Sequence, residues 1–190
     1  SSDLWANNQA ILRLARSVSP PDYVLLFNPD AEMRDGGVEA LAAVLDDHAD
    51  IGAVGSLLED EGGEASGAAF RFHSPAREFL RGVHVAALGR LLGISPMMVP
   101  SSTLADVDWV TGASVMFRMR ALEQSGLFDS GFFLYFEEVE LMWRLRRTGW
   151  RVAHEPASKA VHIGGASTGV DRDQHVVLVG PPRPAYWFAS

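Results

Sequence analysis

Asn28-Pro29-Asp30 follows directly on the apolar run 23–27, which is typical of a strand buried on both faces. A carboxylate at the carboxyl end of such a strand lies where open α/β sheets bind their ligands. Because hard cations prefer oxygen ligands, this carboxylate can hold Mg²⁺ or Mn²⁺ against a diphosphate. The same residue types also form ordinary turns, and the motif taken alone favours a turn.

The segment 136–140 gathers three carboxylates at the start of the strongest expected helix. Glu137, Glu138 and Glu140 repel one another, which raises a carboxyl pKa as a general base requires. Acidic side chains in a first turn also complement the helix dipole, and this explains the charge by itself. It does not explain the apolar approach 132–136, which would bring the carboxylates to a site without water. Both interpretations stay open.

His162 ends a β-prone stretch and is followed closely by Gly164 and Gly165. A neutral imidazole at a strand end can ligate a metal, and the glycines let backbone amides approach phosphate oxygens. A surface histidine before a loop is the competing explanation, and it is favoured when the motif is taken in isolation.

Trp109 opens the sequence Trp-Val-Thr-Gly-Ala. Its ring face can stack on a sugar, and the small pair Gly112 and Ala113 leaves room for one. Packing in the core is the more common role for a tryptophan in an apolar run, and spacing alone favours that role.

The composition limits the classes of protein that these motifs can serve. The chain has 190 residues, a formal net charge of −8, 47% hydrophobic residues and no cysteine. The length fits one domain, and the proportions are those of a globular chain. The acidic balance argues against a nucleic-acid binder, and the missing cysteines exclude disulfides, thiolate metal sites and cysteine nucleophiles. No apolar run approaches the ~20 residues that span a bilayer.

The elements that must position the motifs alternate along the chain. Apolar periodicity predicts helices from Leu4 to Ala15, after Asp35 (stripe Val38, Leu41, Ala42, Leu45), over 75–93, over 121–125 and over 137–148 with Val139, Met142, Trp143 and Leu145 inward. Strands are predicted at 23–27, 51–58, 70–72, 107–119, 152–153 and 160–162, with loops at 59–68 and 95–103. This alternation predicts an α/β domain with a mostly parallel sheet.

The order of the motifs carries more information than any one of them. The series runs Asn28-Pro29-Asp30, Trp109 to Ala113, Gly126 to Asp129, Phe132 to Leu141, Trp143 to Trp150, and His162 with Gly164 to Ser167. It resembles the family 2 glycosyltransferases, especially their bacterial rhamnosyltransferase-like branch. The resemblance runs from about Asn7 to Ser167.

The resemblance implies a GT-A-like, Rossmann-related fold with a mostly parallel sheet flanked by helices. It also implies an inverting transfer of a sugar, rhamnose in this branch, from a nucleotide-diphospho-sugar to a glycan or lipid-linked acceptor in bacterial polysaccharide synthesis. Mg²⁺ or Mn²⁺ would assist, and nucleic acid would not be a partner. The expected location is the cytoplasm, with the parent protein at the inner face of the membrane.

Individual positions take family roles by the same resemblance. Asp30 and His162 would bind the metal, and Asn28, Gly164 and Gly165 would bind the donor. Glu138, beside Glu137, would be the catalytic base, while Trp109, Thr111, Gly112 and Ala113 would line the sugar and acceptor pocket.

Two departures from the family pattern shape these expectations. Glu138 stands where the family usually has Asp as the base, and Glu140 likewise replaces an Asp. The first strand of the family, with its Thr-Tyr-Asn-like turn, has no counterpart before Asn7. We therefore expect residues 1–190 to form a single domain, the later part of an N-terminally truncated catalytic domain.

The departures leave other functions open. One alternative is a non-catalytic carbohydrate-binding or assembly module with the same fold. A metal-dependent hydrolase that uses the same carboxylates is a more distant option. A truncated sheet would also leave an open edge, which favours a homo-oligomer.

Overall fold

The computed structural model describes residues 2–66, 68–72, 99, 102–131 and 136–162. The elements are α1 (Ser2–Ala15), β1 (Tyr23–Phe27), β2 (Ala31–Met33), α2 (Gly37–Asp47), β3 (Ile51–Glu59), β4 (Ala65–Ser66), β5 (Ala69–Phe70), β6 (Ala105–Val107), β7 (Trp109–Val110), β8 (Ser114–Arg118), α5 (Met119–Ser125), α6 (Glu137–Arg147) and β9 (Arg151–His162). The helix expected over 75–93 and most of the loop 95–103 lie outside the described residues. Among the described residues, no helix is long and apolar enough to cross a membrane.

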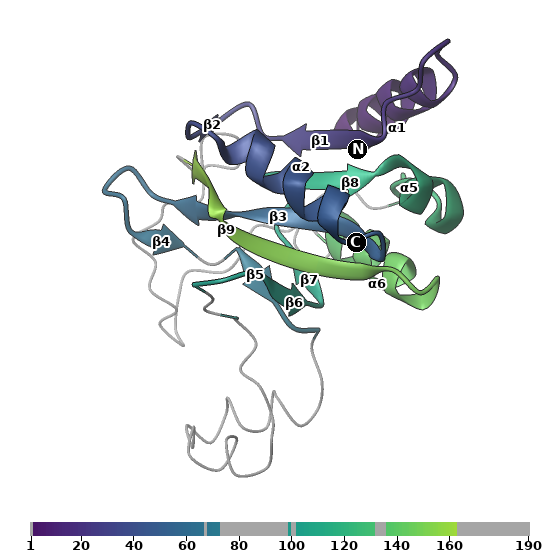
Figure 1. Ribbon diagram of the computed structural model, residues 1–190. Coiled ribbons are helices and arrows are strands. Elements are labelled where there is room, and N and C mark those ends of the chain that lie inside the picture. Colours follow the sequence, from purple (N-terminus) through teal and green to yellow (C-terminus); the bar gives the residue numbers. More distant parts are fainter. Residues whose placement is uncertain (1, 67, 73–98, 100–101, 132–135, 163–190) are drawn as a thin grey trace, which may run out of the picture.

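A seven-stranded mixed sheet forms the centre of the molecule, with the order β1-β8-β3-β9-β2 and β4 and β6 attached to β3 and β9 (Figure 1). Within the described part, β3 and β9 pair in parallel, and the other pairs of this sheet are antiparallel. The α/β class is confirmed, but the expectation of mostly parallel pairing is wrong. A continuously apolar strand reports burial on both faces, and burial does not fix the direction of the neighbouring strand.

Helices cover both faces of this sheet, and alternate residues of each strand supply the two cores. On one face α1, α5 and α6 pack on Val24, Ala53, Val115, Phe117 and Val152. On the other face α2 packs on Leu25, Val54, Met116 and Ala153. Figure 1 shows α2 on one side of the strands, α5 and α6 on the other, and α1 beside β1.

Two inward positions expected from helical periodicity are exposed. Trp143 on α6 is 45% exposed and Val38 on α2 is 42% exposed, whereas Leu141 and Val44 are buried. A helix of a globular protein buries a stripe little more than 100° wide, and the residue next to that stripe stays outside. The Trp143 ring instead lies under the Arg147 guanidinium, 4.7 Å from its centroid.

The last strand, β9, is one continuous element, although two short strands were expected. It runs through Pro156 because a bulge interrupts its pairing with β3: Ser56 is opposite Glu155, yet Leu57 is opposite Lys159. The bulge is fastened by a buried hydroxyl, since Ser158 Oγ lies 2.8 Å from Ser56 Oγ.

Candidate active site

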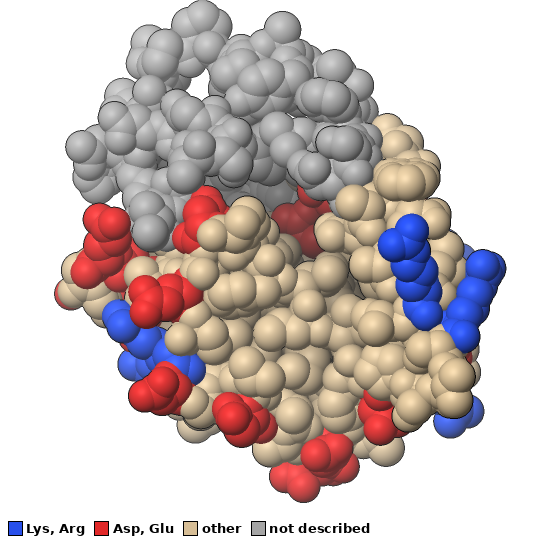
Figure 2. Space-filling model, turned by 90° about the horizontal axis from the view of Figure 1, so that it is seen from above, with Lys and Arg blue, Asp and Glu red and all other residues tan. Residues whose placement is uncertain are grey.

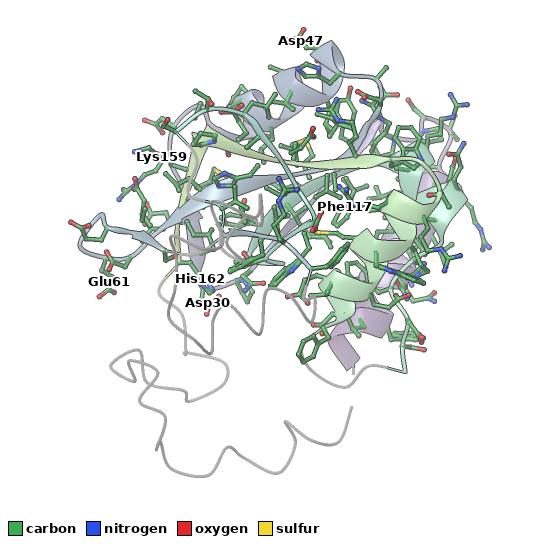
Figure 3. The ribbon with its side chains drawn as sticks, turned by 90° about the horizontal axis from the view of Figure 1, so that it is seen from below. Asp30, Asp47, Glu61, Phe117, Lys159 and His162 are labelled. Carbon is green, nitrogen blue, oxygen red and sulfur yellow. The ribbon has the colours of Figure 1, made fainter. Side chains whose placement is uncertain are left out.

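Asp30 and His162 meet at the ends of neighbouring strands. His162 Nε2 lies 3.3 Å from Asp30 Oδ1 and 3.4 Å from Asn28 Nδ2. Both side chains are largely buried, and Figure 3 shows them side by side. Register explains the meeting, because β2 begins directly after Asp30 and its first residue, Ala31, is opposite His162 in β9. The structure thus brings together three residues that the sequence proposed for one function.

The atoms of Asp30 and His162 that could coordinate a metal, Oδ1 and Nε2, are spaced as two ligands of a small divalent cation. Two neighbouring ligands of an octahedral ion at about 2.1 Å are roughly 3 Å apart, close to the 3.3 Å between Nε2 and Oδ1. The described residues contain no group of three or more His, Cys, Asp or Glu placed to hold a metal. Mg²⁺ sites commonly have few protein ligands and complete their shell with water and substrate phosphates, so the pair suits a metal shared with a diphosphate.

Glu137 and Glu138 open α6 from an unusual backbone position. Phe136, the residue before them, is left-handed with φ 66°, and it is the one non-glycine residue of the described chain with a positive φ. This conformation costs about 1–2 kcal/mol for a residue with a Cβ, so the surrounding structure must impose it. Half of the Phe136 surface is exposed. The strained backbone of Phe136 thus sets the direction of the first turn of α6, which carries both carboxylates.

Burial, followed by repulsion from Glu137, raises the pKa of Glu138 to about 7. The backbone hydrogen bond at Glu138 acts in the opposite direction and is the smallest of the three causes. The neighbouring Glu137 is also partly removed from water, since its Oε2 is buried without a hydrogen-bond partner among the described residues. A carboxyl with a pKa near 7 is suited to accept a proton at neutral pH.

Residues four apart on α6 follow the extended chain that leads into β8. Arg146 Nη1 donates to the carbonyl of Val107 at 2.9 Å, and one turn earlier Met142 Sδ accepts the N–H of Val110 at 3.2 Å. Glu138 lies one further turn toward the start of α6, four residues before Met142.

Gly112 follows Val110 by two residues and lies in the predicted sugar-binding segment. A Cβ built on Gly112 meets no atom of the described structure within 4 Å, so the space above it is open. Thr111, also partly exposed, donates its N–H to the carbonyl of Ala68 at 3.1 Å. The buried Ala113 accepts the N–H of Asn28 at 3.0 Å. The segment therefore joins the helix carrying Glu138 to the strand end carrying Asn28.

Trp109 is held as a partly exposed platform. Its ring stacks on Phe70 across the β5–β7 pair, with centroids 4.2 Å apart and planes 18° from parallel. Asp108 fixes this pair by accepting the N–H of Phe72 at 2.8 Å and by pairing with Arg71 and Arg146. The indole Nε1 is buried without a partner among the described residues, which leaves a donor for a ligand or water.

The structure separates Glu140 from the other two carboxylates. Glu140 pairs with Arg144 through two short bonds, whereas no such ion pair is found for Glu137 or Glu138 among the described residues. Sequence reasoning missed Arg144 and also Asn8, whose amide bonds both backbone groups of Phe128. The only available signal was the spacing of Glu140 and Arg144 by four residues on a helix. The remaining predicted residues, Gly164 and Gly165, lie outside the described residues.

Comparison with known proteins gives related sequences and similar folds. No family model matches the sequence. The N-acetylglucosaminyl-diphospho-decaprenol L-rhamnosyltransferase of Mycobacterium tuberculosis is 30% identical over 177 residues, which are 89% of this chain and 55% of that protein. The chain is therefore similar in sequence to a bacterial rhamnosyltransferase over most of its own length. Rhamnosyltransferase WbbL of Escherichia coli K12 is 25% identical over 161 residues, 82% of this chain and 58% of that protein.

The chain spans about half the length of the curated relatives it matches. In fold it is similar to GalNAc-T7, crystallised with UDP, GalNAc and Mn²⁺, with a TM-score of 0.56 and 14% identity over 84% of this chain and 30% of the other. It is also similar to A197 from STIV, with a TM-score of 0.52 and 11% identity over 84% of this chain and 66% of the other. The expected glycosyltransferase resemblance and GT-A-like fold are confirmed.

Proposed function

We propose that this chain carries the transfer chemistry of an inverting glycosyltransferase. The transferred sugar is rhamnose, the donor is a nucleotide-diphospho-sugar, and the acceptor is a lipid-linked glycan. Relatives named as rhamnosyltransferases, one of them for a decaprenol-linked acceptor, support the sugar and acceptor classes. A lipid-linked acceptor would bring the full protein to a membrane surface during bacterial polysaccharide synthesis.

In this proposal Glu138 is the general base. Its carboxylate removes the proton from an acceptor hydroxyl, and the hydroxyl oxygen attacks the anomeric carbon from the face opposite the diphosphate. The bond from that carbon to the diphosphate oxygen breaks in the same displacement, so the configuration inverts. Glu137 keeps the pKa of Glu138 high enough for this exchange by its negative charge. Glu138 is one methylene longer than the aspartate usual at this position, and its carboxylate can still accept the proton.

Asp30 and His162 hold the metal in this proposal, with Asn28 beside them. Mg²⁺ or Mn²⁺ held by these residues would supply the positive charge that the leaving diphosphate needs. Trp109 presents its ring to a sugar, and the open space at Gly112 admits the reacting part of the substrate. Gly164 and Gly165 are proposed to contribute backbone amides to the donor phosphates.

One observation carries the proposal: Glu138 combines a pKa near 7 with a place one turn before Met142, the α6 residue that binds the N–H of Val110, next to the segment with open space at Gly112. A solvated first-turn glutamate that served only the helix dipole would have a pKa near or below the ordinary 4.5. The raised value indicates a carboxyl kept from water next to a segment with room for a ligand.

The test is an assay of donor hydrolysis and transfer with nucleoside-diphospho-rhamnose and Mg²⁺ or Mn²⁺, performed on this chain and on the full gene product. We expect Glu138→Gln to abolish transfer and Asp30→Ala to remove its metal dependence together with most activity. Asp47→Asn, at an exposed carboxylate on α2, is the matched control and should behave as the parent. Full activity in both site variants would refute the residue roles. Glycan binding without metal-dependent nucleotide binding, measured by calorimetry, would favour a non-catalytic module.

A further inference from the structure

We propose that Arg144 is a positioning residue for the carboxylates at the start of α6. Its guanidinium is seated between Glu140 and the chain that leaves α5, and it fixes the turn from which Glu137 and Glu138 project. This inference rests on the proposed role of Glu138 as the base, and it adds a residue that acts through that base without touching substrate.

The guanidinium of Arg144 donates four hydrogen bonds. Nε and Nη2 bind the two carboxylate oxygens of Glu140 at 2.6 and 2.7 Å. Nη1 donates to the carbonyl of Ser125 at 2.5 Å, and Nη2 also donates to that of Leu127 at 2.7 Å. Only arginine offers a planar fork of donors that serves a carboxylate and two carbonyls at once. The carbonyls lie at the negative end of α5, where a cation is favoured.

Gly126 is shaped to admit this guanidinium. Its φ of 84° belongs to the left-handed region that side chains disfavour, and a Cβ built on it would lie 2.9 Å from Arg144 Nη1. The glycine is therefore needed both for the turn after α5 and for the space that Arg144 occupies. This is a second observation, independent of the hydrogen bonds, that the chain is built around Arg144.

The same stretch of chain is held from its other side by α1. Asn8 Nδ2 donates to the carbonyl of Phe128 at 2.8 Å, and Asn8 Oδ1 accepts the N–H of Phe128 at 3.1 Å. Residues 125–128 are thus fixed between α1 and α6 before the chain turns toward the start of α6. An adaptable surface loop would not need side-chain bonds from two helices.

Glu140 transmits this constraint to the carboxylates. Its N–H donates to the carbonyl of the left-handed Phe136 at 2.9 Å, while its side chain holds Arg144. Glu140 therefore connects the fixed segment 125–128 to the turn that contains Glu137 and Glu138. Without Arg144, an unfavourable φ at Phe136 would lose part of what imposes it, and we expect the first turn to rotate and hydrate.

The direct test is a carboxyl titration of Glu138 by ¹³C NMR in the 190-residue chain. Arg144→Met keeps the length of the side chain and removes the fork, and Gly126→Ala keeps every donor and acceptor while displacing the guanidinium. We expect both to move the Glu138 midpoint by at least about one unit from near 7 toward 4.5, because the carboxyl gains water. Arg147→Met, also in the last turn of α6 but stacked on Trp143, should leave the midpoint unchanged.

Thermal unfolding and transfer kinetics complete the test. If the Arg144 and Gly126 variants lower the Tm while Glu138 titrates as in the parent, Arg144 is only structural and the inference is overturned. In the full gene product, Arg144→Met should lower kcat by roughly 100-fold with little change in the donor KM, and Arg144→Lys should restore part of it. Full transfer by Glu138→Gln would refute the proposed base, whereas the titration would still report whether Arg144 positions it.

Discussion

His162 Nε2 lies 3.3 Å from Asp30 Oδ1 because β2 and β9 pair with Ala31 opposite His162. One carboxylate and one imidazole at adjacent strand ends would form the two-ligand site that we propose, with its remaining positions left for a diphosphate. Asp30 directly precedes β2 and His162 is the last residue of β9, so the pairing of these two strands sets their approach.

Removing either ligand should weaken metal binding in the presence of nucleotide. We expect Asp30→Ala and His162→Ala each to reduce Mn²⁺ affinity by at least about tenfold, which corresponds to ~1.4 kcal/mol. Calorimetry with Mn²⁺ and a nucleoside diphosphate measures the effect, and EDTA should reverse binding in the parent. Asp47→Ala, on the exposed surface of α2, should bind as the parent does. Equal affinities in all four proteins would place the metal elsewhere.

The raised pKa of Glu138 makes the chain less stable at high pH. Between about pH 4.5 and 7 the unfolded chain releases this proton while the folded chain keeps it, so the free energy of unfolding falls as pH rises. Glu138→Gln should match the parent near pH 4 and exceed it by about 1–3 kcal/mol at pH 8. Urea denaturation at both pH values measures this, and a difference independent of pH would contradict it.

His154 has the opposite effect. It is 2% exposed, and burial lowers its pKa from 6.5, while the nearby backbone of Ser56 partly offsets the shift. Below about pH 6.5 the unfolded chain takes up a proton that the folded chain resists, so the free energy of unfolding falls as pH falls. His154→Leu should remove this loss, and thermal unfolding from pH 7.5 to 5 should show a smaller decrease in Tm than in the parent. An identical decrease would exclude His154 as its source.

Two glycines separate folding from function. A Cβ on Gly55 would lie 2.7–2.9 Å from three carbons of the Val110 side chain, whereas one on Gly112 would meet nothing within 4 Å. We expect Gly55→Ala to lower the free energy of unfolding by about 1–3 kcal/mol. Gly112→Ala should leave stability within about 0.5 kcal/mol and reduce transfer. Urea curves and activity are measured together, and a stable, fully active Gly112→Ala would remove Gly112 from the site.

The local elements were predictable because they rest on local chemistry. Helical spacing of Leu41 and Leu45, or of Leu141 and Leu145, has one simple solution. The apolar run 23–27 is a strand as predicted, but it lies at the edge of the described sheet and only Val24 of it is buried. The helix start at Glu137 was also found, since capping and charge act within one turn. These signals depend on neighbours in the sequence, and the structure confirms the elements they predicted.

The features that could not be predicted from the sequence depend on contacts between segments that are far apart in the chain. Strand direction is set by partners, so the antiparallel position of β8 between β1 and β3 could not be inferred from its composition. The bonds from Arg144 to carbonyls of α5, and from Asn8 to Phe128, join segments whose approach only the fold determines. The juxtaposition of Asp30 and His162 was anticipated through a family resemblance, since spacing alone left each with an ordinary explanation.

Charge distribution matches a site that handles a metal and a sugar more than a polyanion. On the face shown in Figure 2, acidic side chains lie to the left of and below a broad uncharged area, basic side chains lie at its right edge, and a smaller basic group lies at its left. Phosphate groups that approach a surface with so few cations need a metal ion to compensate their charge. Asp30 and His162 are the residues that we propose to hold it.

The bulge in β9 decides on which side of the sheet His162 lies. Between Glu155 and Lys159 the strand carries three more residues than β3 does, and three is odd. Even-numbered side chains of β9 therefore lie on opposite sides of the sheet before and after the bulge. His154 lies on one side, and Ala160 and His162 lie on the other. Shortening the bulge by a single residue would reverse this phase and turn the imidazole away from Asp30. His162, the proposed metal ligand, thus takes its side of the sheet from the odd number of residues in the bulge, which the contact between Ser158 and Ser56 holds within the core.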